Sequence, residues 1–278
     1  MIELFEPAVK WSGSKRSQAK EIIDLFPKEI ETYYEPFCGG CSVLRRLLSS
    51  DIKVNKYICS DINQDLIKLW IMIRDNPIEL SCYYEKLWHE LNIDDNKERK
   101  KNYFESVRTR YNTEHDAKDF LFIMRTTTNG MPRYNSRGEF NNSFHITRNG
   151  IEPKKLENIL LEWSNLLKVN EVEFVCQSFD KIESKEKDIL YLDPPYFNTK
   201  GMYFHNSIDF NEFFYWLRKQ KGKYFLSFDG KSGEIDNTYS VPTDLYSEHK
   251  YLRSGNSSFK RTIGKSNNSI VYESLYLK

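Results

Sequence analysis

A β-prone run that ends in two prolines constrains the fold of this chain more than any other feature. Residues 188–192 read Asp-Ile-Leu-Tyr-Leu, and Asp193-Pro194-Pro195-Tyr196 follows directly. The run predicts a buried strand that stops where proline can no longer donate to a sheet ladder. A carboxylate, two carbonyls and an aromatic ring would then lie at the C-terminal edge of a sheet, where open α/β folds bind ligands. This set suits a flat ring that bears an amino group, although a proline-rich turn without a chemical role also fits.

The rest of the chain alternates between helical and strand patterns. Helices are expected at residues 14–26, 43–48 (with Ser42 as the cap), 64–73, 80–88, 97–111, 116–124 and 153–167. Strands are expected at residues 32–37, 56–60, 171–176, 188–192, 223–228, 249–253 and 269–277. Residues 126–149 are polar and turn-rich, and Asn-Ser-Arg-Gly at 135–138 is typical of a hairpin tip. The pattern predicts an α/β sheet domain, residues 1–75 and 166–278, interrupted by a mostly helical insertion, residues 76–165.

A glycine pair indicates where a ligand approaches the backbone. Gly39-Gly40 follows an expected strand and precedes an expected helix, and Asp61 ends the next strand 22 positions after Gly39. That spacing is typical of nucleotide-binding units in which an acid reaches a ribose hydroxyl. The chain lacks a full G-x-G-x-x-G, and the acids Glu35, Asp61 and Asp193 favour a cationic nucleoside such as S-adenosylmethionine. A tight turn without a ligand is the alternative.

The N-terminal loop Lys10-Trp11-Ser12-Gly13-Ser14-Lys15 precedes an expected helix. Trp11 could cover a ligand and Lys15 could pair with a carboxylate. On its own, the segment also fits a simple capping loop.

Positive charge is concentrated in one part of the chain. The net charge is only +1, yet residues 97–155 hold thirteen Lys/Arg against seven Asp/Glu, a local +6 that leaves −5 elsewhere. Arg133, Arg137 and Arg148 lie in the turn-rich stretch, where Glu139 is an isolated acid. This distribution favours a surface that faces phosphates, with a solvated helical surface as the alternative.

Composition excludes several classes of protein. The mean hydropathy is −0.66, and no apolar run approaches the roughly 18 residues of a membrane span, so we expect a soluble protein. Residues 1–6 contain no basic segment that leads into an apolar one, so we expect no secretory signal, and five scattered cysteines are consistent with reduced thiols in a cytoplasm. Cys38 and Cys41 form a C-x-x-C without the second ligand pair of a zinc site, so no metal is expected.

Five segments, taken in order, resemble motifs of the DNA adenine methyltransferase (Dam) family, which includes bacterial, phage and restriction-associated GATC-type enzymes. They are Lys10-Trp11-x-Gly13-x-Lys15, Glu35-Pro36-Phe37-Cys38-Gly39-Gly40, Asp61-Ile62-Asn63, Arg133-Tyr134-Asn135-x-Arg137-Gly138-Glu139-Phe140-Asn141 and Asp193-Pro194-Pro195-Tyr196. The resemblance spans almost the whole chain. It implies a Rossmann-like class I methyltransferase sheet with an inserted, mostly helical target-recognition domain that carries a β-hairpin.

The resemblance also implies a role for each motif. Contacts to S-adenosylmethionine, which leaves as S-adenosylhomocysteine, are implied for Trp11, Lys15, Phe37, Gly39, Asp61, Phe179 and Asp193. DNA contacts are implied for Lys10, Tyr134, Asn135 and Arg137, with Tyr134 a candidate for stacking into the duplex. Asp193, Pro194 and Tyr196 would be catalytic. Lys260 and Arg261, in a serine-rich segment, are expected to contact phosphates, with a solvated loop as the alternative.

Two departures from the family pattern bear on affinity and specificity. Cys41 stands where the family loop usually has a second glycine; a small thiol is expected to fit, with some effect on cofactor affinity. After the hairpin the family often reads N-V-P-F-G, whereas residues 141–145 here read Asn-Asn-Ser-Phe-His. The recognised sequence therefore need not be plain GATC.

The implied function is site-specific transfer of a methyl group to the N6 amine of a flipped-out adenine in duplex DNA, at GATC or a GAT-containing site. Double-stranded DNA is the expected partner, and the enzyme is expected to be a cytoplasmic monomer. A cognate restriction endonuclease, a phage origin and a preference for hemimethylated DNA stay open. The alternatives are an RNA or protein methyltransferase and a catalytically silent DNA-binding protein.

Overall fold

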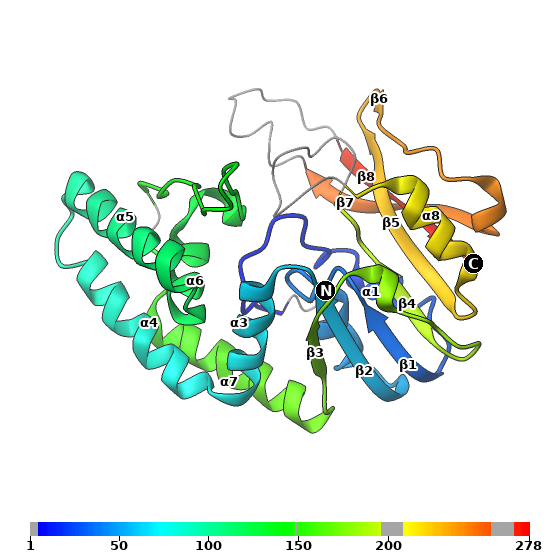
Figure 1. The fold of residues 1–278 in the computed structure, drawn as a ribbon, viewed down its shortest axis with the longest axis horizontal. Helices are drawn as coiled ribbons and strands as arrows, with labels where there is room; N and C mark the ends of the chain where they lie inside the picture. The colour runs from blue at the N-terminus through cyan, green and yellow to red at the C-terminus, as the bar shows by residue number, and fades with distance from the viewer. Residues whose placement is uncertain (1–4, 148, 196–207, 257–269) are drawn as a thin grey trace.

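The computed structural model describes residues 5–147, 149–195, 208–256 and 270–278, and a mixed sheet lies at one side of the molecule (Figure 1). Its strands follow the order β3-β2-β1-β4-β5-β8-β7, with β6 paired to β5. Their bounds are β1 (Glu29–Glu35), β2 (Lys53–Asp61), β3 (Glu173–Cys176), β4 (Ile189–Leu192), β5 (Lys223–Ser232), β6 (Ile235–Asp236), β7 (Glu248–Asn256) and β8 (Ile270–Leu277).

The sheet combines a parallel half with an antiparallel edge. Strands β1 to β5 pair in parallel, whereas β8 pairs antiparallel with both β5 and β7. The strand order reverses between β1 and β4, which is the place where doubly wound sheets bind ligands. The predicted α/β class is therefore confirmed.

Strand β4 separates two apolar cores. Leu190 and Leu192 belong to the core beneath helix α8 (Phe210–Lys219), whereas Ile189 and Tyr191 belong to the core on the opposite face. All four residues of β4 are buried, as expected for a central parallel strand covered on both faces.

Helix α8 is absent from the sequence-based expectations, although its signals are local. The Asp209 carboxylate accepts hydrogen bonds from the amides of Asn211 and Glu212, as an N-cap residue does. The buried residues of the helix recur at helical spacing; they are Phe210, Phe213, Phe214, Trp216 and Leu217.

Four helices build a lobe beside the sheet (Figure 1). They are α4 (Pro77–Leu91), α5 (Lys97–Glu114), α6 (Ala117–Thr126) and α7 (Pro153–Val169). Helix α7 packs against both α4 and α3 (Gln64–Asp75), which follows β2. One cluster of buried apolar residues continues from the sheet into the lobe. The core therefore does not mark a boundary between two domains, and the predicted boundaries at residues 76 and 165 stay a prediction.

The segment between α6 and α7 is largely irregular. A short 3₁₀ turn, η1 (Thr128–Gly130), follows α6, and isolated bridges join Thr127 to Phe144 and Tyr134 to Phe140. The expected hairpin tip is a turn in which the amide of Gly138 donates to the carbonyl of Asn135 at 3.0 Å. We call residues 133–141 the recognition hairpin.

Two local expectations need correction. Helix α1 (Ala19–Ile23) is shorter than the expected 14–26, because the chain first turns around Lys15, whose carbonyl accepts from the amides of Gln18 and Ala19. Ser42 does not cap α2 (Ser42–Leu47); it is the first helical residue, after an N-cap without a side-chain bond. Within the described ranges, no helix combines the length and apolar character needed to cross a bilayer.

Candidate active site and nucleic-acid interface

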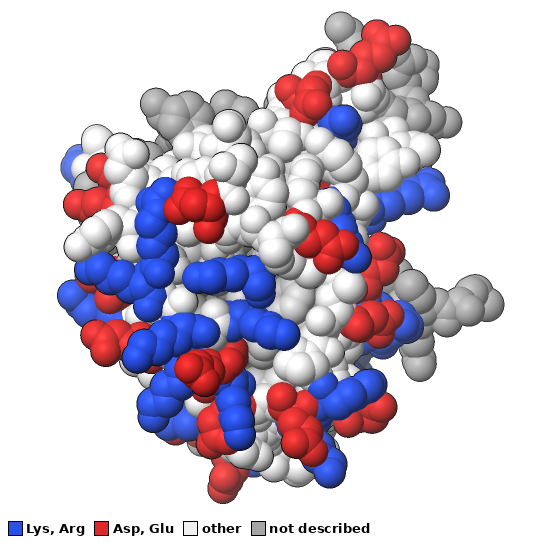
Figure 2. All heavy atoms as spheres, turned by 90° about the vertical axis from the view of Figure 1, so that its right-hand side faces the viewer, with Lys and Arg blue, Asp and Glu red and all other residues white. Residues whose placement is uncertain are grey.

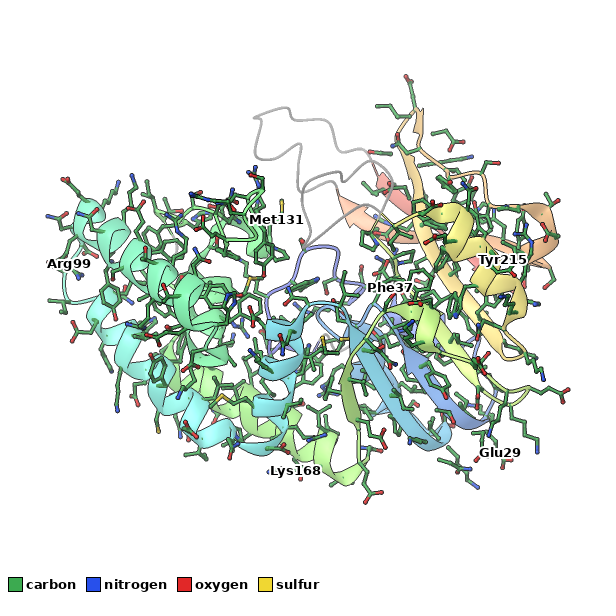
Figure 3. The ribbon with its side chains drawn as sticks, in the orientation of Figure 1. Glu29, Phe37, Arg99, Met131, Lys168 and Tyr215 are labelled. Atoms are coloured by element: carbon green, nitrogen blue, oxygen red, sulfur yellow. The ribbon has the colours of Figure 1, made fainter. Side chains whose placement is uncertain are left out.

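The motif loops meet at the C-terminal edge of the parallel strands. Strands β2, β1 and β4 are neighbours, so the segments after Asp61, Glu35 and Leu192 leave the sheet side by side. The amide of Cys38 donates to the carbonyl of Ser60 at 3.0 Å, which ties two of these segments together. Figure 3 shows Phe37 at this edge and Glu29 at the opposite edge, where β1 begins.

The glycine pair lies directly beneath an indole ring. A Cβ built on Gly39 would come within 2.8 Å of Nε1 of Trp11, and one on Gly40 within 3.1 Å of the Trp11 Cβ. Gly39 has φ of +42°, and its carbonyl accepts a hydrogen bond of 2.9 Å from Nε1 of Trp70 on α3. A side chain at position 39 would therefore displace Trp11 as well as strain the backbone.

Asp61 is held by backbone amides at the end of β2. Its two oxygens accept hydrogen bonds from the amide of Asn63 at 3.0 Å and from the amide of Gly39 at 3.4 Å. Burial raises the pKa of Asp61 to about 6 in spite of these bonds. The acid is thus linked to the glycine loop, as the spacing of the two motifs led us to expect.

An aromatic wall stands beside the end of β1. The ring centroid of Phe37 lies 5.7 Å from that of Phe179 and 6.1 Å from that of Phe213 on α8. Phe179 also meets Trp216 edge-on at 5.1 Å. The structure therefore brings together two residues expected at the cofactor site and supports them from α8.

Lys15 is the electrostatic centre of the site. Its Nζ lies 2.8 Å from both carboxylate oxygens of Asp193 and 3.2 Å from Oε2 of Glu273 on β8. Burial alone would lower the pKa of Lys15, but the two carboxylates outweigh that effect and raise it. Glu273 had not been anticipated, because 258 residues separate it from Lys15 and no motif surrounds it.

Glu35 does not face the cofactor side, contrary to its grouping with Asp61 and Asp193. It is buried, and its Oε2 accepts hydrogen bonds from the Tyr33 hydroxyl at 2.6 Å and from the Leu44 amide at 3.1 Å. Burial raises its pKa to about 8, against the lowering effect of both bonds. Glu35 thus satisfies an amide in the first turn of α2, the role expected of Ser42.

Cys41 occupies a backbone conformation that favours glycine. Its φ is +51°, in the left-handed region, and its side chain is fully buried. The thiol fits in space as expected, but it does so with a backbone conformation that costs a non-glycine residue about 1–2 kcal/mol.

In the recognition hairpin, some of the side chains expected to contact DNA are exposed and others are held inside the structure. Arg137 is 78% exposed and lies 3.0 Å from Glu139. Oδ1 of Asn135 accepts from the amides of Arg137 and Glu139, so this side chain shapes the turn. Tyr134 points inward, and its hydroxyl accepts a hydrogen bond from Nδ2 of Asn63 at 3.2 Å. In this conformation Tyr134 is not positioned to stack into a duplex.

Lys10 lies where the N-terminal loop meets the lobe. Its Nζ donates to the carbonyl of Thr127 at 3.4 Å, and the amide of Ser12 donates to the carbonyl of Gly130 at 3.0 Å. Arg125 on α6 donates to the carbonyls of Pro7 and Ala8. Lys10 therefore lies beside η1, which precedes the recognition hairpin, and its expected contact with DNA stays a prediction.

Much of the basic excess is used inside the lobe. Arg110 pairs with the buried Asp119 at 2.6 Å, and Lys100 is buried against Asn92 and Asn149. Among the described hairpin residues, Arg133 and Arg137 are the exposed basic side chains.

Figure 2 shows the face of the molecule on the side of the sheet. Basic and acidic side chains lie close together over its lower half, a mixed pattern unlike a phosphate-binding surface.

Several expected residues lie outside the described part of the chain. They are Tyr196, Lys260, Arg261 and Arg148. Among the described residues, no group of three or more His, Cys, Asp and Glu side chains could hold a metal ion.

Residues 11–227 match the model of the D12 class N6 adenine-specific DNA methyltransferase family. This match covers most of the chain, and the protein belongs to that family. It is 30% identical over 258 residues to the type II methyltransferase M.MjaIII of Methanocaldococcus jannaschii, a match that covers 85% of each chain. It is 32% identical over 196 residues to the DNA adenine methylase of Haemophilus influenzae, covering 68% of this chain and 63% of that one. M.FokI of Planomicrobium okeanokoites is 26% identical, and the match spans 95% of this chain but only 42% of the relative.

Proposed function

We propose that this protein transfers the methyl group of S-adenosylmethionine to the N6 amine of an adenine within double-stranded DNA. Family membership supports an adenine-specific DNA methyltransferase. The observation that carries the proposal is the position of Asp193 at the edge of β4, held by Lys15 next to the glycine loop.

The chain's own residues fit the proposed cofactor. The bare backbone at Gly39 and Gly40 allows close approach, and Asp61 lies next to it as an acceptor for ribose hydroxyls. Phe37 and Phe179 provide an apolar surface for an adenine ring. Bound S-adenosylmethionine would supply a methyl group already activated by its sulfonium, and nearby acids favour that positive charge.

Asp193 and Pro194 would prepare the amine. The lone pair of an adenine amine is delocalised into the ring, so the nitrogen is a poor nucleophile. A carboxylate oxygen of Asp193 and the carbonyl of Pro194 would accept hydrogen bonds from its two N–H groups and stabilise the positive charge that develops on nitrogen. Lys15, 2.8 Å from both oxygens of Asp193, fixes the orientation of that carboxylate. Alignment of this kind corresponds to effective molarities of about 10⁵–10⁸ M.

Access to the amine requires that the adenine leave the duplex. Flipping costs on the order of a few kcal/mol, and stacking on an aromatic ring returns roughly 1–3 kcal/mol. We assign that stacking to Tyr196 by its place in the D-P-P-Y motif. Arg137, at the exposed tip of the hairpin, is proposed to read a guanine in the major groove, and Lys10 and Asn135 to contact DNA beside it.

The proposed target is GATC or a site that contains GAT. Asn142, Ser143 and His145 differ from the family pattern and lie just after the hairpin, so the recognised sequence need not be plain GATC. We further propose that the enzyme acts as a monomer, and that any endonuclease of the same system cuts the site that this enzyme protects.

The proposal is tested by the product of the purified protein. The protein is incubated with isotope-labelled S-adenosylmethionine and, separately, with duplex DNA, RNA and a protein extract, and the digested products are analysed by mass spectrometry. We expect label in N6-methyldeoxyadenosine, and long-read sequencing of the same DNA then gives the site. Label in RNA or protein, or binding of DNA without any transfer, would support the competing functions instead.

A further inference from the structure

A short chain of hydrogen bonds joins the glycine loop to the recognition hairpin. The amide of Gly39 donates to Oδ2 of Asp61 at 3.4 Å, and the amide of Asn63 donates to Oδ1 of the same acid at 3.0 Å. Nδ2 of Asn63 then donates to the hydroxyl of Tyr134 at 3.2 Å. Three bonds thus connect two segments that are separated by more than ninety positions in the sequence.

The side chain of Asn63 is fixed in its orientation. It is 5% exposed, and its Oδ1 accepts hydrogen bonds of 3.1 Å from the amides of Asp65 and Leu66 at the start of α3. The amide nitrogen is therefore directed away from the helix and toward Tyr134. Because the cap leaves the Asn63 side chain little freedom, a small movement of the Asn63 backbone changes its hydrogen bond to Tyr134.

Tyr134 is equally well anchored on the hairpin side. Its ring meets Phe140 edge-on at 5.7 Å, and the two residues form the bridge that closes the hairpin. A second connection runs from α3 to α5: Oδ2 of Asp65 accepts a hydrogen bond of 2.7 Å from the Tyr111 hydroxyl. These contacts link the hairpin to the cofactor acid through α3 and α5, and the bond between Asn63 and Tyr134 is the direct connection.

We infer that the bond between Asn63 and Tyr134 couples cofactor binding at Asp61 to DNA binding at the recognition hairpin. The inference rests on the proposed function and adds two positioning residues to it. A ligand that engages Asp61 alters its hold on the Asn63 amide, and Asn63 transmits the change to Tyr134. Because linkage is reciprocal, DNA on the hairpin must change cofactor affinity by the same factor.

The test measures affinity rather than turnover. The dissociation constant of S-adenosylhomocysteine is measured by calorimetry with and without the duplex that the wild-type protein methylates, and the ratio is the coupling factor. Tyr134→Phe keeps the ring and removes the hydroxyl. Asn63→Ser keeps a helix-capping oxygen but is too short to reach Tyr134. Tyr84→Phe, which removes a hydroxyl bonded to Ile151 at 2.9 Å elsewhere in the lobe, is the matched control.

We expect each of the two variants to reduce the coupling factor by about 2- to 10-fold, the effect of one hydrogen bond. The double variant should lose no more than Tyr134→Phe alone, because that variant already removes the contact that Asn63→Ser removes. Tyr84→Phe should retain the wild-type factor. Equal cofactor affinity with and without DNA in the wild type, unchanged coupling in Tyr134→Phe, or an equal loss in Tyr84→Phe would each overturn the inference. A wild-type protein that methylates no duplex would contradict the proposed function itself.

Discussion

Glu35 makes stability depend on pH, because the fold disfavours the charged form of this buried side chain. Burial raises its pKa from 4.5 to about 8, so the folded chain holds the proton more tightly than the unfolded chain. The contribution of Glu35 to stability is therefore greatest below its unfolded pKa and falls as the pH rises toward 8. We compare the free energy of unfolding of Glu35→Gln with that of the wild type at about pH 5 and about pH 9. The difference should shift in favour of the variant at the higher pH by on the order of a few kcal/mol.

Urea unfolding at the two pH values checks this prediction. Glu90→Gln, which changes an exposed acid in the lobe, is the control and should show no such gain. A stability difference between Glu35→Gln and the wild type that is the same at both pH values would contradict the assignment.

Arg137 is the residue whose loss should change specificity. Its exposed guanidinium must leave Glu139 to reach a base, so the ion pair at 3.0 Å belongs to the DNA-free state. We expect Arg137→Ala to relax discrimination at one base pair by about 1–3 kcal/mol. Methylation of a set of duplexes that differ by single base pairs measures the effect. Nδ2 of Asn135 donates to Oε2 of Glu139 at 2.7 Å. Glu139→Gln, which removes the ion pair with Arg137 but keeps this acceptor, should retain the wild-type preference. An unchanged preference in Arg137→Ala would exclude Arg137 as a reader.

The sequence predicted which single residues gather at the site better than it predicted their partners. Gly39, Asp61 and Asp193 follow three strands, so their meeting at one edge could be anticipated. The neighbours that fix them could not, because they depend on packing between distant segments. Glu273 reaches Lys15 from β8, and Glu35 turns inward to serve α2.

At the level of elements, the contact between the N-terminal loop and η1 is one of the connections between the sheet side and the lobe, beside the packing of α3 against α6 and α7. Gly130 has φ of +62°, and a Cβ there would lie 2.8 Å from the carbonyl oxygen of Lys10. Gly138 has φ of +78° with open space around it. Both alanine variants suffer backbone strain, but only Gly130→Ala also forces two backbones apart. We expect Gly130→Ala to be less stable than Gly138→Ala by at least about 1 kcal/mol.

Thermal and urea unfolding of the two variants test this difference. Gly130→Ala should also reduce methyl transfer more than Gly138→Ala, because Lys10 and Trp11 precede the displaced contact. Equal stabilities would show that the loop yields freely and does not fix the lobe.

Elements were predictable where their signals are local and periodic. The five parallel strands and most helices fall near their expected ranges. The segment from Thr128 to Asn149 is different, because two isolated bridges and side-chain bonds shape it in place of a ladder. Tyr134 points inward, where its hydroxyl accepts a hydrogen bond from Asn63 at the start of α3. The local sequence around Tyr134 does not predict this contact.

At the level of the whole molecule, a count of charges does not show which basic side chains stay available to a phosphate. The local excess of +6 in residues 97–155 favours a surface that faces phosphates, with a solvated helical surface as the alternative. The structure instead places Lys100, Arg110 and Arg125 in internal bonds, which hold the lobe together and tie it to residues 7–8. A count of Lys and Arg in the sequence cannot distinguish basic side chains that bond within the protein from those that stay available to bind a phosphate.

The proposed methyl transfer uses three parts of the molecule at once: the glycine loop, the end of β4 and the hairpin. Its central step has Asp193 accept a hydrogen bond from the adenine amine, and the most direct measurement compares methyl transfer with DNA binding in Asp193→Ala. We expect transfer to fall by at least about 10²-fold while the duplex dissociation constant changes only a few-fold. Glu273→Gln, which alters the other partner of Lys15, should keep far more activity. Near-normal turnover in Asp193→Ala, or a loss of DNA affinity as large as the loss of transfer, would contradict the claim.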